Sequence, residues 1–126
     1  MLFFGMYALQ HRGQESCGMA VFDNDQLSLH KGLGLVSQVF NEELLRKFTG
    51  QVGVGHTRYS TAGDCSLENA QPVVSRSPVG SLVLAHNGNL FNLEKLRERF
   101  SLEYADAYGA NSDSHLMARC VAQALV

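Results

Sequence analysis

The order of apolar and polar residues predicts alternating helices and strands along the chain. Apolar side chains recur at helical spacing from Leu2 to Leu9, and Gly13 is a suitable C-terminal cap for this first helix. Residues 16–23 have the composition of a strand, and the turn formers at 24–26 predict a hairpin with the segment that follows. The first quarter of the chain therefore predicts one helix and two paired strands.

The middle of the chain continues with short elements. Asn41 and the acidic residues after it predict a helix over residues 42–48. In "QVGVGHTRYS" apolar residues alternate with glycines, which predicts a strand from Val52 that lies close to another backbone. Residues 61–72 have loop composition, and the apolar run 81–86 predicts a further strand.

The last third predicts two helices. Asn92 is suited to cap the first of them, and Ser112 the second. The second carries an apolar stripe at helical spacing, formed by Leu116, Met117, Cys120, Val121 and Leu125. Strands in hairpin-like succession followed by helices indicate the α+β class, with a largely antiparallel sheet covered by helices.

Length and charge limit the classes of function. The 126 residues suit one domain with one core, and a formal charge of −2 without a basic cluster argues against nucleic-acid and membrane partners. A small neutral or zwitterionic ligand fits this balance better. The three cysteines are far apart and the histidines are scattered, so we expect no disulfide framework, no metal and a reducing, cytoplasmic location.

Polar residues gather at three predicted strand ends or helix starts, within residues 56–63, 86–89 and 111–115. Arg58 could pair its guanidinium with a carboxylate, and Asp113 in the first turn of a helix could hold an ammonium group. Each residue alone is more simply explained as a surface arginine or a helix-start acid. Together they could hold the two charges of an α-amino acid.

The pair Asn87 and Gly88 allows two interpretations. An asparagine amide and a neighbouring glycine N–H can both donate to an oxygen that gains negative charge in a reaction. Asn-Gly is also the commonest hairpin turn. With an amino acid bound beside it, the first interpretation predicts attack on a side-chain amide, most simply that of glutamine.

Several motifs occur in the order of a known family. These are "ALQHRGQES", "GLGLVSQVF", "GVGHTRYSTAG", "LENAQP", "LAHNGNL" and "SDSH". They resemble the glutaminase domain of amidophosphoribosyltransferases, within the N-terminal-nucleophile glutamine amidotransferases. The resemblance covers almost the whole chain and implies a four-layer αββα sandwich of the Ntn-hydrolase type, truncated here at both ends.

The resemblance also implies roles for individual residues. It implies that Arg58 and Thr61 bind the glutamine carboxylate, that Asp113 binds its ammonium, and that Asn87 with Gly88 forms the oxyanion hole. It places Arg12 near the nucleophile, which in this family is a cysteine at the start of the mature chain. We expect Cys17 to be buried and inert, Cys65 to be an exposed bystander and Cys120 to be core, so that this chain alone has weak or no glutaminase activity.

The expected organisation is a partial glutaminase domain over residues 1–126, without the phosphoribosyltransferase domain that would use the ammonia to make 5-phosphoribosylamine for purine synthesis. Mg²⁺ is expected only in that absent domain, and no cofactor in this chain. Expected partners are glutamine, the chain's own phosphoribosyltransferase domain and further copies in a homo-oligomer. The alternatives are a non-catalytic glutamine-binding module, a structural fragment, or the glutaminase domain of another enzyme of this class, such as glucosamine-6-phosphate synthase.

Overall fold

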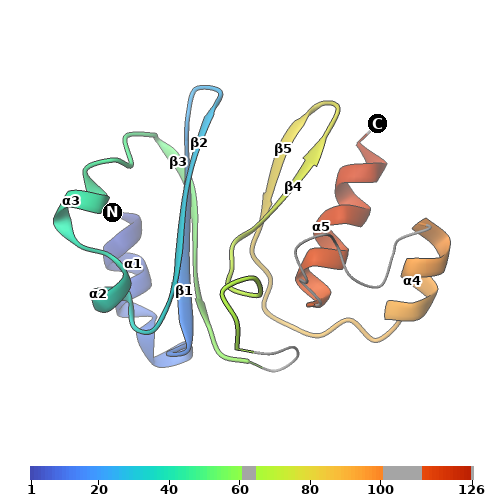
Figure 1. Cartoon of the computed structure of the whole chain (residues 1–126), viewed down its shortest axis with the longest axis horizontal. Helices are drawn as coiled ribbons and strands as arrows, with labels where there is room; N and C mark the ends of the chain where they lie inside the picture. Colours follow the sequence, from blue (N-terminus) through green and yellow to red (C-terminus); the bar gives the residue numbers. More distant parts are fainter. Residues whose placement is uncertain (61–64, 101–111, 126) are drawn as a thin grey trace.

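The computed structural model describes residues 1–60, 65–100 and 112–125 (Figure 1). In these ranges two antiparallel sheets lie face to face, and helices cover their outer faces (Figure 1). Helices α1 (Leu2–Ala8), α2 (Val36–Val39) and α3 (Glu42–Leu45) lie outside the first sheet. Helix α5 (Asp113–Ala124) covers the second sheet, and α4 (Leu93–Phe100) packs against α5. The expected α+β class and the αββα layering are therefore confirmed.

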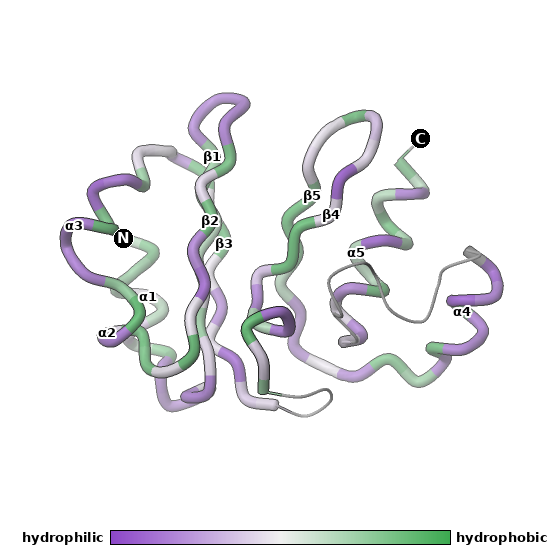
Figure 2. Tube along the Cα trace, viewed as in Figure 1, coloured by the Kyte–Doolittle hydropathy of each residue, from purple (hydrophilic) through white to green (hydrophobic). Residues whose placement is uncertain are grey.

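The first sheet has the order β2-β1-β3, with β1 at Ser16–Asp23, β2 at Gln26–Leu33 and β3 at Val52–Arg58. The predicted hairpin is confirmed, because Asp23 pairs with Gln26 and the turn between them places Asn24 at a φ of 53°. Asparagine adopts this left-handed conformation more readily than most residues. Figure 2 shows that the tip of this hairpin is hydrophilic.

The pleat of β1 divides its side chains between two environments. Cys17, Met19 and Val21 point toward the helices and form a core with Met6, Val36 and Phe40. The alternate residues belong to the face between the two sheets, where Gly18 pairs with His56 and Ser16 pairs with Arg58. A Cβ on Gly18 would collide with the backbone oxygen of Gln71. Glycine therefore lets the second half of the chain approach β1 closely at this point.

The outer layer beside the first sheet consists of α1 (Leu2–Ala8), the 3₁₀ helix η1 (Gln10–Arg12), α2 (Val36–Val39) and α3 (Glu42–Leu45). Asn41 caps α3 as predicted, with its Oδ1 accepting a hydrogen bond from the Leu44 N–H at 2.8 Å. A Cβ on Gly55 would collide with the Met6 side chain, whereas one on Gly53 would lie 3.0 Å from the backbone oxygen of Ala20. The predicted approach to another backbone is therefore found at Gly53, while Gly55 makes room for a helix side chain.

The prediction that Gly13 caps the first helix holds only in part. The α-helix ends at Ala8 with Leu9 as its cap, and Gly13 is instead the C-cap of the 3₁₀ helix that follows, with an extended φ of −169° and its N–H donating to the Gln10 carbonyl. Gly13 also approaches β3 closely, because a Cβ at this position would collide with the backbone between Thr57 and Arg58. The chain can therefore turn from η1 into β1 directly against the end of β3.

The second sheet is a hairpin of β4 (Val73–Ser77) and β5 (Gly80–Leu84). The sequence did not predict β4, and β5 ends two residues earlier than the predicted 86. Gly80 makes the tight turn possible, with a φ of +135° that favours glycine. Helix α4 spans Leu93–Phe100, and α5 spans Asp113–Ala124.

The buried face of α5 differs from the predicted apolar stripe. Its buried apolar residues are Leu116, Ala118 and Ala122, whereas Val121 is 38% exposed and Leu125 is 49% exposed. Cys120 is only half-buried, so its assignment to the core is wrong. Alanines on the buried face let the helix lie close to β4 and β5, which a stripe of larger side chains would prevent.

Candidate active site

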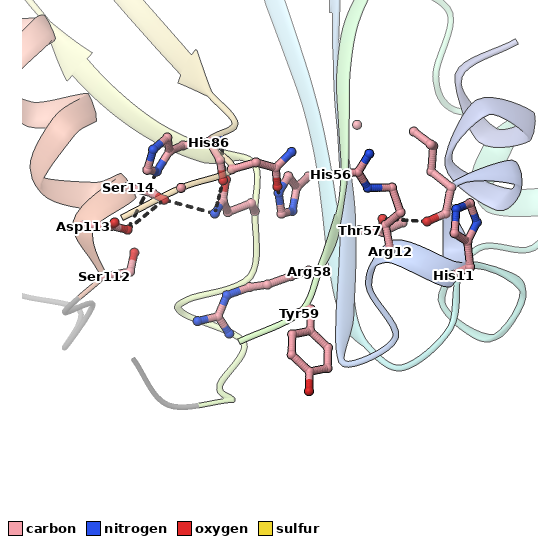
Figure 3. Close-up of a pocket in the computed structure, with 15 residues that line it drawn as sticks. His11, Arg12, His56, Thr57, Arg58, Tyr59, His86, Ser112, Asp113 and Ser114 are labelled. Atoms are coloured by element: carbon pink, nitrogen blue, oxygen red, sulfur yellow. Dashed lines mark hydrogen bonds and ion pairs between the residues drawn. The ribbon is translucent and has the colours of Figure 1, made fainter. Parts of the chain in front are cut away.

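The ends of β3 and β5 and the start of α5 meet around one cleft of about 490 Å³ (Figure 3). The predicted site residues Arg12, Arg58, Asn87, Gly88 and Asp113 all line it. Thr61 lies outside the described residues. Segments that are distant in sequence therefore contribute to one cavity, although the sequence alone could assign each residue only to its own strand end or helix start.

Arg58 is the last residue of β3 and is 4% exposed. Its Nη1 donates to Ser60 Oγ at 3.0 Å, and Ser60 in turn donates from both its hydroxyl and its backbone N–H to one carboxylate oxygen of Glu15. Glu15 thereby compensates the buried positive charge through Ser60. In Figure 3 the Arg58 side chain extends from β3 toward Ser112 and Asp113.

Asp113 is the first residue of α5 and is 9% exposed. Its Oδ2 accepts a hydrogen bond from the Leu90 N–H at 3.1 Å, and its Oδ1 accepts one from Ser114 Oγ at 3.4 Å. The helix N-terminus adds a partial positive charge beside this carboxylate. Each oxygen keeps acceptor capacity beyond these bonds, so the carboxylate can also accept from an ammonium group in the cleft.

Asn87 and Gly88 follow the end of β5. They do not form a hairpin turn, because β5 pairs with β4, which precedes it. Gly88 has a φ of +150°, and a Cβ here would lie 2.9 Å from Nε2 of His86. Backbone conformation and space both favour glycine at this position. The hairpin-turn alternative for this pair is therefore wrong, and its backbone and side chain face the cleft.

Gln71 holds the Asn87 segment to the start of α5. Its Oε1 accepts from the backbone N–H of His86 at 2.7 Å, and its Nε2 donates to the His86 carbonyl at 3.2 Å and to Ser114 Oγ at 3.0 Å. Gln71 is only 5% exposed. We did not predict this role. The available signal was an amide side chain inside the otherwise apolar run from Ala70 to Val74, because a buried amide requires partners.

His56 contacts Asn87 directly. Its Nε2 lies 3.0 Å from Asn87 Oδ1, and the residue is 7% exposed. Burial is the main cause that lowers the pKa of His56 below its ordinary value, and the charge of Arg58 acts in the same direction. The hydrogen bond with Asn87 and the backbone of His86 oppose this shift. The ring is therefore neutral at physiological pH.

None of the three cysteines lines the cleft as far as the described ranges extend. Cys17 is fully buried on the helix-facing side of β1, and burial raises the pKa of its thiol to about 11. This is the inert thiol that the sequence predicts. Cys65 is exposed, and partial burial raises the pKa of Cys120.

Arg12 lines the cleft from a different direction. In Figure 3, Arg12 and His11 lie on the α1 side of β3, whereas Arg58 and Asp113 lie on the other side. Arg12 is exposed. A group placed beside Arg12 would have to reach past the end of β3 to meet Asn87 and Asp113.

In the described part of the chain, no three side chains among the His, Cys, Asp and Glu residues come together in a way that could hold a metal ion. No helix in the same ranges combines the length and the apolar character needed to cross a membrane.

Comparison with known proteins agrees with this geometry. An amidophosphoribosyltransferase from Synechococcus elongatus is 49% identical over 125 residues, which are 99% of this chain and 25% of the relative. One from Mycobacterium leprae is 54% identical over 100 residues, which are 79% of this chain and 18% of the relative. The chain therefore spans about a quarter or less of the length of these relatives.

Solved structures give the same result. The glutamine phosphoribosylpyrophosphate amidotransferase from B. subtilis, complexed with ADP and GMP, is 40% identical with a TM-score of 0.76, and the match covers 92% of this chain and 25% of that one. A structure described as the allosteric regulatory enzyme of purine biosynthesis gives 42% identity and a TM-score of 0.79, covering 94% and 25%. The family model for the glutamine amidotransferase domain matches residues 42–124. The chain belongs to the glutamine amidotransferase domain family.

Proposed function

We propose that this chain is the glutaminase part of an amidophosphoribosyltransferase, a cytoplasmic enzyme that moves the amide nitrogen of glutamine to phosphoribosyl pyrophosphate and makes 5-phosphoribosylamine for purine synthesis. The observation that carries the proposal is that Arg58, Asn87, Gly88 and Asp113 line one cleft. Membership of the amidotransferase family and the identity to amidophosphoribosyltransferases support it. For the native-length protein the proposal includes a phosphoribosyltransferase domain that binds Mg²⁺, and assembly into a homo-oligomer.

Glutamine would bind with its two charged groups between Arg58 and Asp113. The buried guanidinium offers a planar pair of donors to the α-carboxylate, and the aspartate accepts from the α-ammonium. Thr61, which lies outside the described residues, is assigned by the family resemblance as a further donor to the carboxylate. Opposite charges at two fixed points would hold the amino acid in one direction, with its side-chain amide near Asn87 and Gly88.

The reaction would begin with a thiolate attacking the amide carbonyl. The carbonyl oxygen becomes negative as the new C–S bond forms, and the Asn87 side-chain amide and the Gly88 N–H would donate to it. Ammonia leaves when the C–N bond breaks and its nitrogen has taken a proton. Water then cleaves the thioester to give glutamate and restores the thiol.

The family resemblance assigns the thiol and the proton-carrying amine to a cysteine at the start of the mature chain. Cys17 does not suit this role, because it is buried on the far face of β1 and its pKa is about 11. The position of Arg12 on the α1 side of β3 suits a residue beside the incoming nucleophile. We therefore expect weak or no turnover from the 126-residue chain by itself.

The test is ammonia release from glutamine by the native-length protein, with and without phosphoribosyl pyrophosphate. The proposal predicts glutamate, ammonia and 5-phosphoribosylamine. Asn87→Ala should lower kcat about 10²- to 10³-fold with little change in KM, the usual loss for one oxyanion donor. Asn24→Gly in the β1–β2 turn is the matched control and should keep full activity. Turnover by the 126-residue chain that survives replacement of all three cysteines would contradict the proposed nucleophile.

A non-catalytic glutamine-binding module is the second candidate, because no described cysteine lines the cleft. Calorimetry distinguishes the two. Glutamine binding that is lost in Asp113→Ala, without any turnover by the native-length protein, would favour the binding module. If the native-length protein neither binds glutamine nor turns it over, both candidate functions are wrong.

A further inference from the structure

His56 occupies a central position between the two sheets. It lies on β3 opposite Gly18 of β1, and its ring reaches the Asn87 side chain, which follows the end of β5. The separation of 3.0 Å between His56 Nε2 and Asn87 Oδ1 is that of a good hydrogen bond. One side chain of the first sheet therefore holds a side chain of the segment that follows the second sheet, at the proposed oxyanion site.

The direction of this hydrogen bond determines what Asn87 offers to the cleft. The amide has one acceptor oxygen and one NH₂ group with two donors. When Oδ1 accepts from His56, the NH₂ group points away from the ring. Among the described residues Nδ2 has no acceptor, so both of its N–H groups remain for a ligand in the cleft.

The opposite arrangement would not suit the proposed reaction. If the His56 proton were on Nδ1, the bare Nε2 would face Oδ1, and two acceptors would repel each other. The amide would then rotate to donate its NH₂ to Nε2, turning Oδ1 toward the cleft. A carbonyl oxygen there would repel the negative oxygen that forms on the substrate.

The surroundings of the ring favour the productive arrangement. His56 Nδ1 is buried and has no hydrogen-bond partner within the described ranges. A proton on Nδ1 would be a buried donor without an acceptor, and buried N–H groups in this state are rare. Placing the proton on Nε2 gives it the Asn87 oxygen instead.

We propose that His56 is a positioning residue, held as the neutral tautomer with its proton on Nε2, which fixes the Asn87 amide so that both of its N–H groups face the substrate. The catalytic meaning of this inference rests on the proposed glutaminase function. His56 itself does not touch the substrate; it acts through Asn87.

The proton is measured first, by nitrogen NMR of the native-length protein with ¹⁵N-labelled histidine. His56→Gln serves to assign the signals of the ring. The expected result over roughly pH 6 to 8, where an ordinary histidine titrates, is a protonated Nε2 and an unprotonated Nδ1. A proton on Nδ1 alone, or a doubly protonated ring at pH 7, would overturn the proposal.

The rate is measured with two variants of His56 and a control. His56→Phe keeps a ring but removes the donor, and kcat for ammonia release should fall about 10- to 100-fold with KM for glutamine nearly unchanged, approaching the loss of an oxyanion donor. His56→Gln can still donate to Asn87 Oδ1 and should recover most of that loss. His30→Phe, on β2 beside Phe40 and outside the cleft, should keep full activity.

The outcomes separate the inference from the proposed function. If the wild-type protein releases no ammonia, the proposed function fails, while the NMR result still decides the direction of the amide. If His56→Phe does not fold, the NMR result and the rate of His56→Gln decide. Equal loss in the Phe and Gln variants, or a rise in KM without a fall in kcat, would show that the donor is irrelevant and would overturn the proposal.

Discussion

Replacing Gln71 by leucine should weaken the connection between the second sheet and α5. The leucine side chain is of broadly similar size, one bond shorter, and has no hydrogen-bonding atoms. It would remove three contacts of the buried amide: the two with the backbone of His86, at 2.7 and 3.2 Å, and the one with Ser114 Oγ at 3.0 Å. The backbone N–H of His86 would lose its acceptor, and the Asn87 segment would lose its tether to the helix.

The magnitude follows from these three bonds. At about 1 kcal/mol each, their loss costs about 3 kcal/mol, and the unpaired His86 N–H adds about 1–2 kcal/mol. Burial of the leucine side chain offsets about 1–2 kcal/mol. The net loss is about 3 kcal/mol, or somewhat more than 100-fold in an opening equilibrium.

Hydrogen exchange of the native-length protein measures this loss where it occurs. Amides of β4, β5 and the first turns of α5 should exchange about 100-fold faster than in the wild type, if their protection reflects opening of this unit. Amides in the β1–β2 hairpin should change much less. Gln123→Leu, at an exposed position of α5, is the matched control and should leave all rates within about twofold. A change below about threefold in β5 and α5 for Gln71→Leu would refute the reasoning.

Three further predictions concern the cleft. Asp113→Asn should weaken glutamine binding about 10- to 100-fold in calorimetry, because a charge-assisted hydrogen bond contributes about 1.5–3 kcal/mol, whereas Asp25→Asn in the exposed hairpin turn should not. Gly88→Ala should lower both the melting temperature and the glutaminase rate, because a φ of +150° is strained for alanine and a Cβ there would lie 2.9 Å from His86 Nε2, so that the His86 ring must shift. The free energy of unfolding should fall as pH drops below 6.5, the ordinary pKa of histidine. The pKa of His56 is lowered in the folded protein, so below this pH the unfolded chain binds more protons than the folded one. His56→Phe should reduce this dependence of stability on pH, measured by denaturant titration at several pH values.

Each of these predictions has a contradicting result. Unchanged glutamine affinity in Asp113→Asn would show that this carboxylate does not bind glutamine. A Gly88→Ala protein with wild-type stability and rate would show that the backbone can relax around the methyl group. An unchanged pH slope in His56→Phe would mean that other groups cause the acid sensitivity.

Local chemistry explains which elements were predictable from sequence. The β1–β2 hairpin depends on turn formers and strand-like flanks, and the α3 cap depends on Asn41, so both were recognised from nearby residues. The β4 strand was missed because Val73 to Ser77 is short and mostly polar, and its stability comes from pairing with β5. The close approach that requires glycine at position 13 involves the backbone of Thr57, which is 44 residues away in the sequence.

The candidate site likewise has features that local sequence determines and features that depend on distant segments. The sequence by itself determined the residue types that could bind an amino acid and stabilise an oxyanion, because Arg58, Asp113 and the Asn87–Gly88 pair carry that chemistry wherever they lie. It could not exclude a hairpin turn at Asn87, since the same dipeptide serves both purposes. The pairing of β5 with the preceding β4 decided this question.

Only the tertiary structure decided which side chains support these groups. Gln71 holds the Asn87 segment to α5, and His56 on β3 of the first sheet is hydrogen-bonded to the Asn87 amide. Cys17 is excluded from the cleft by the pleat of β1, which turns its side chain toward the helices. The physical reason is common to all three: hydrogen-bond direction and strand pleat depend on the packing of distant segments, whereas charge, acidity and backbone freedom are properties that each residue carries in the sequence.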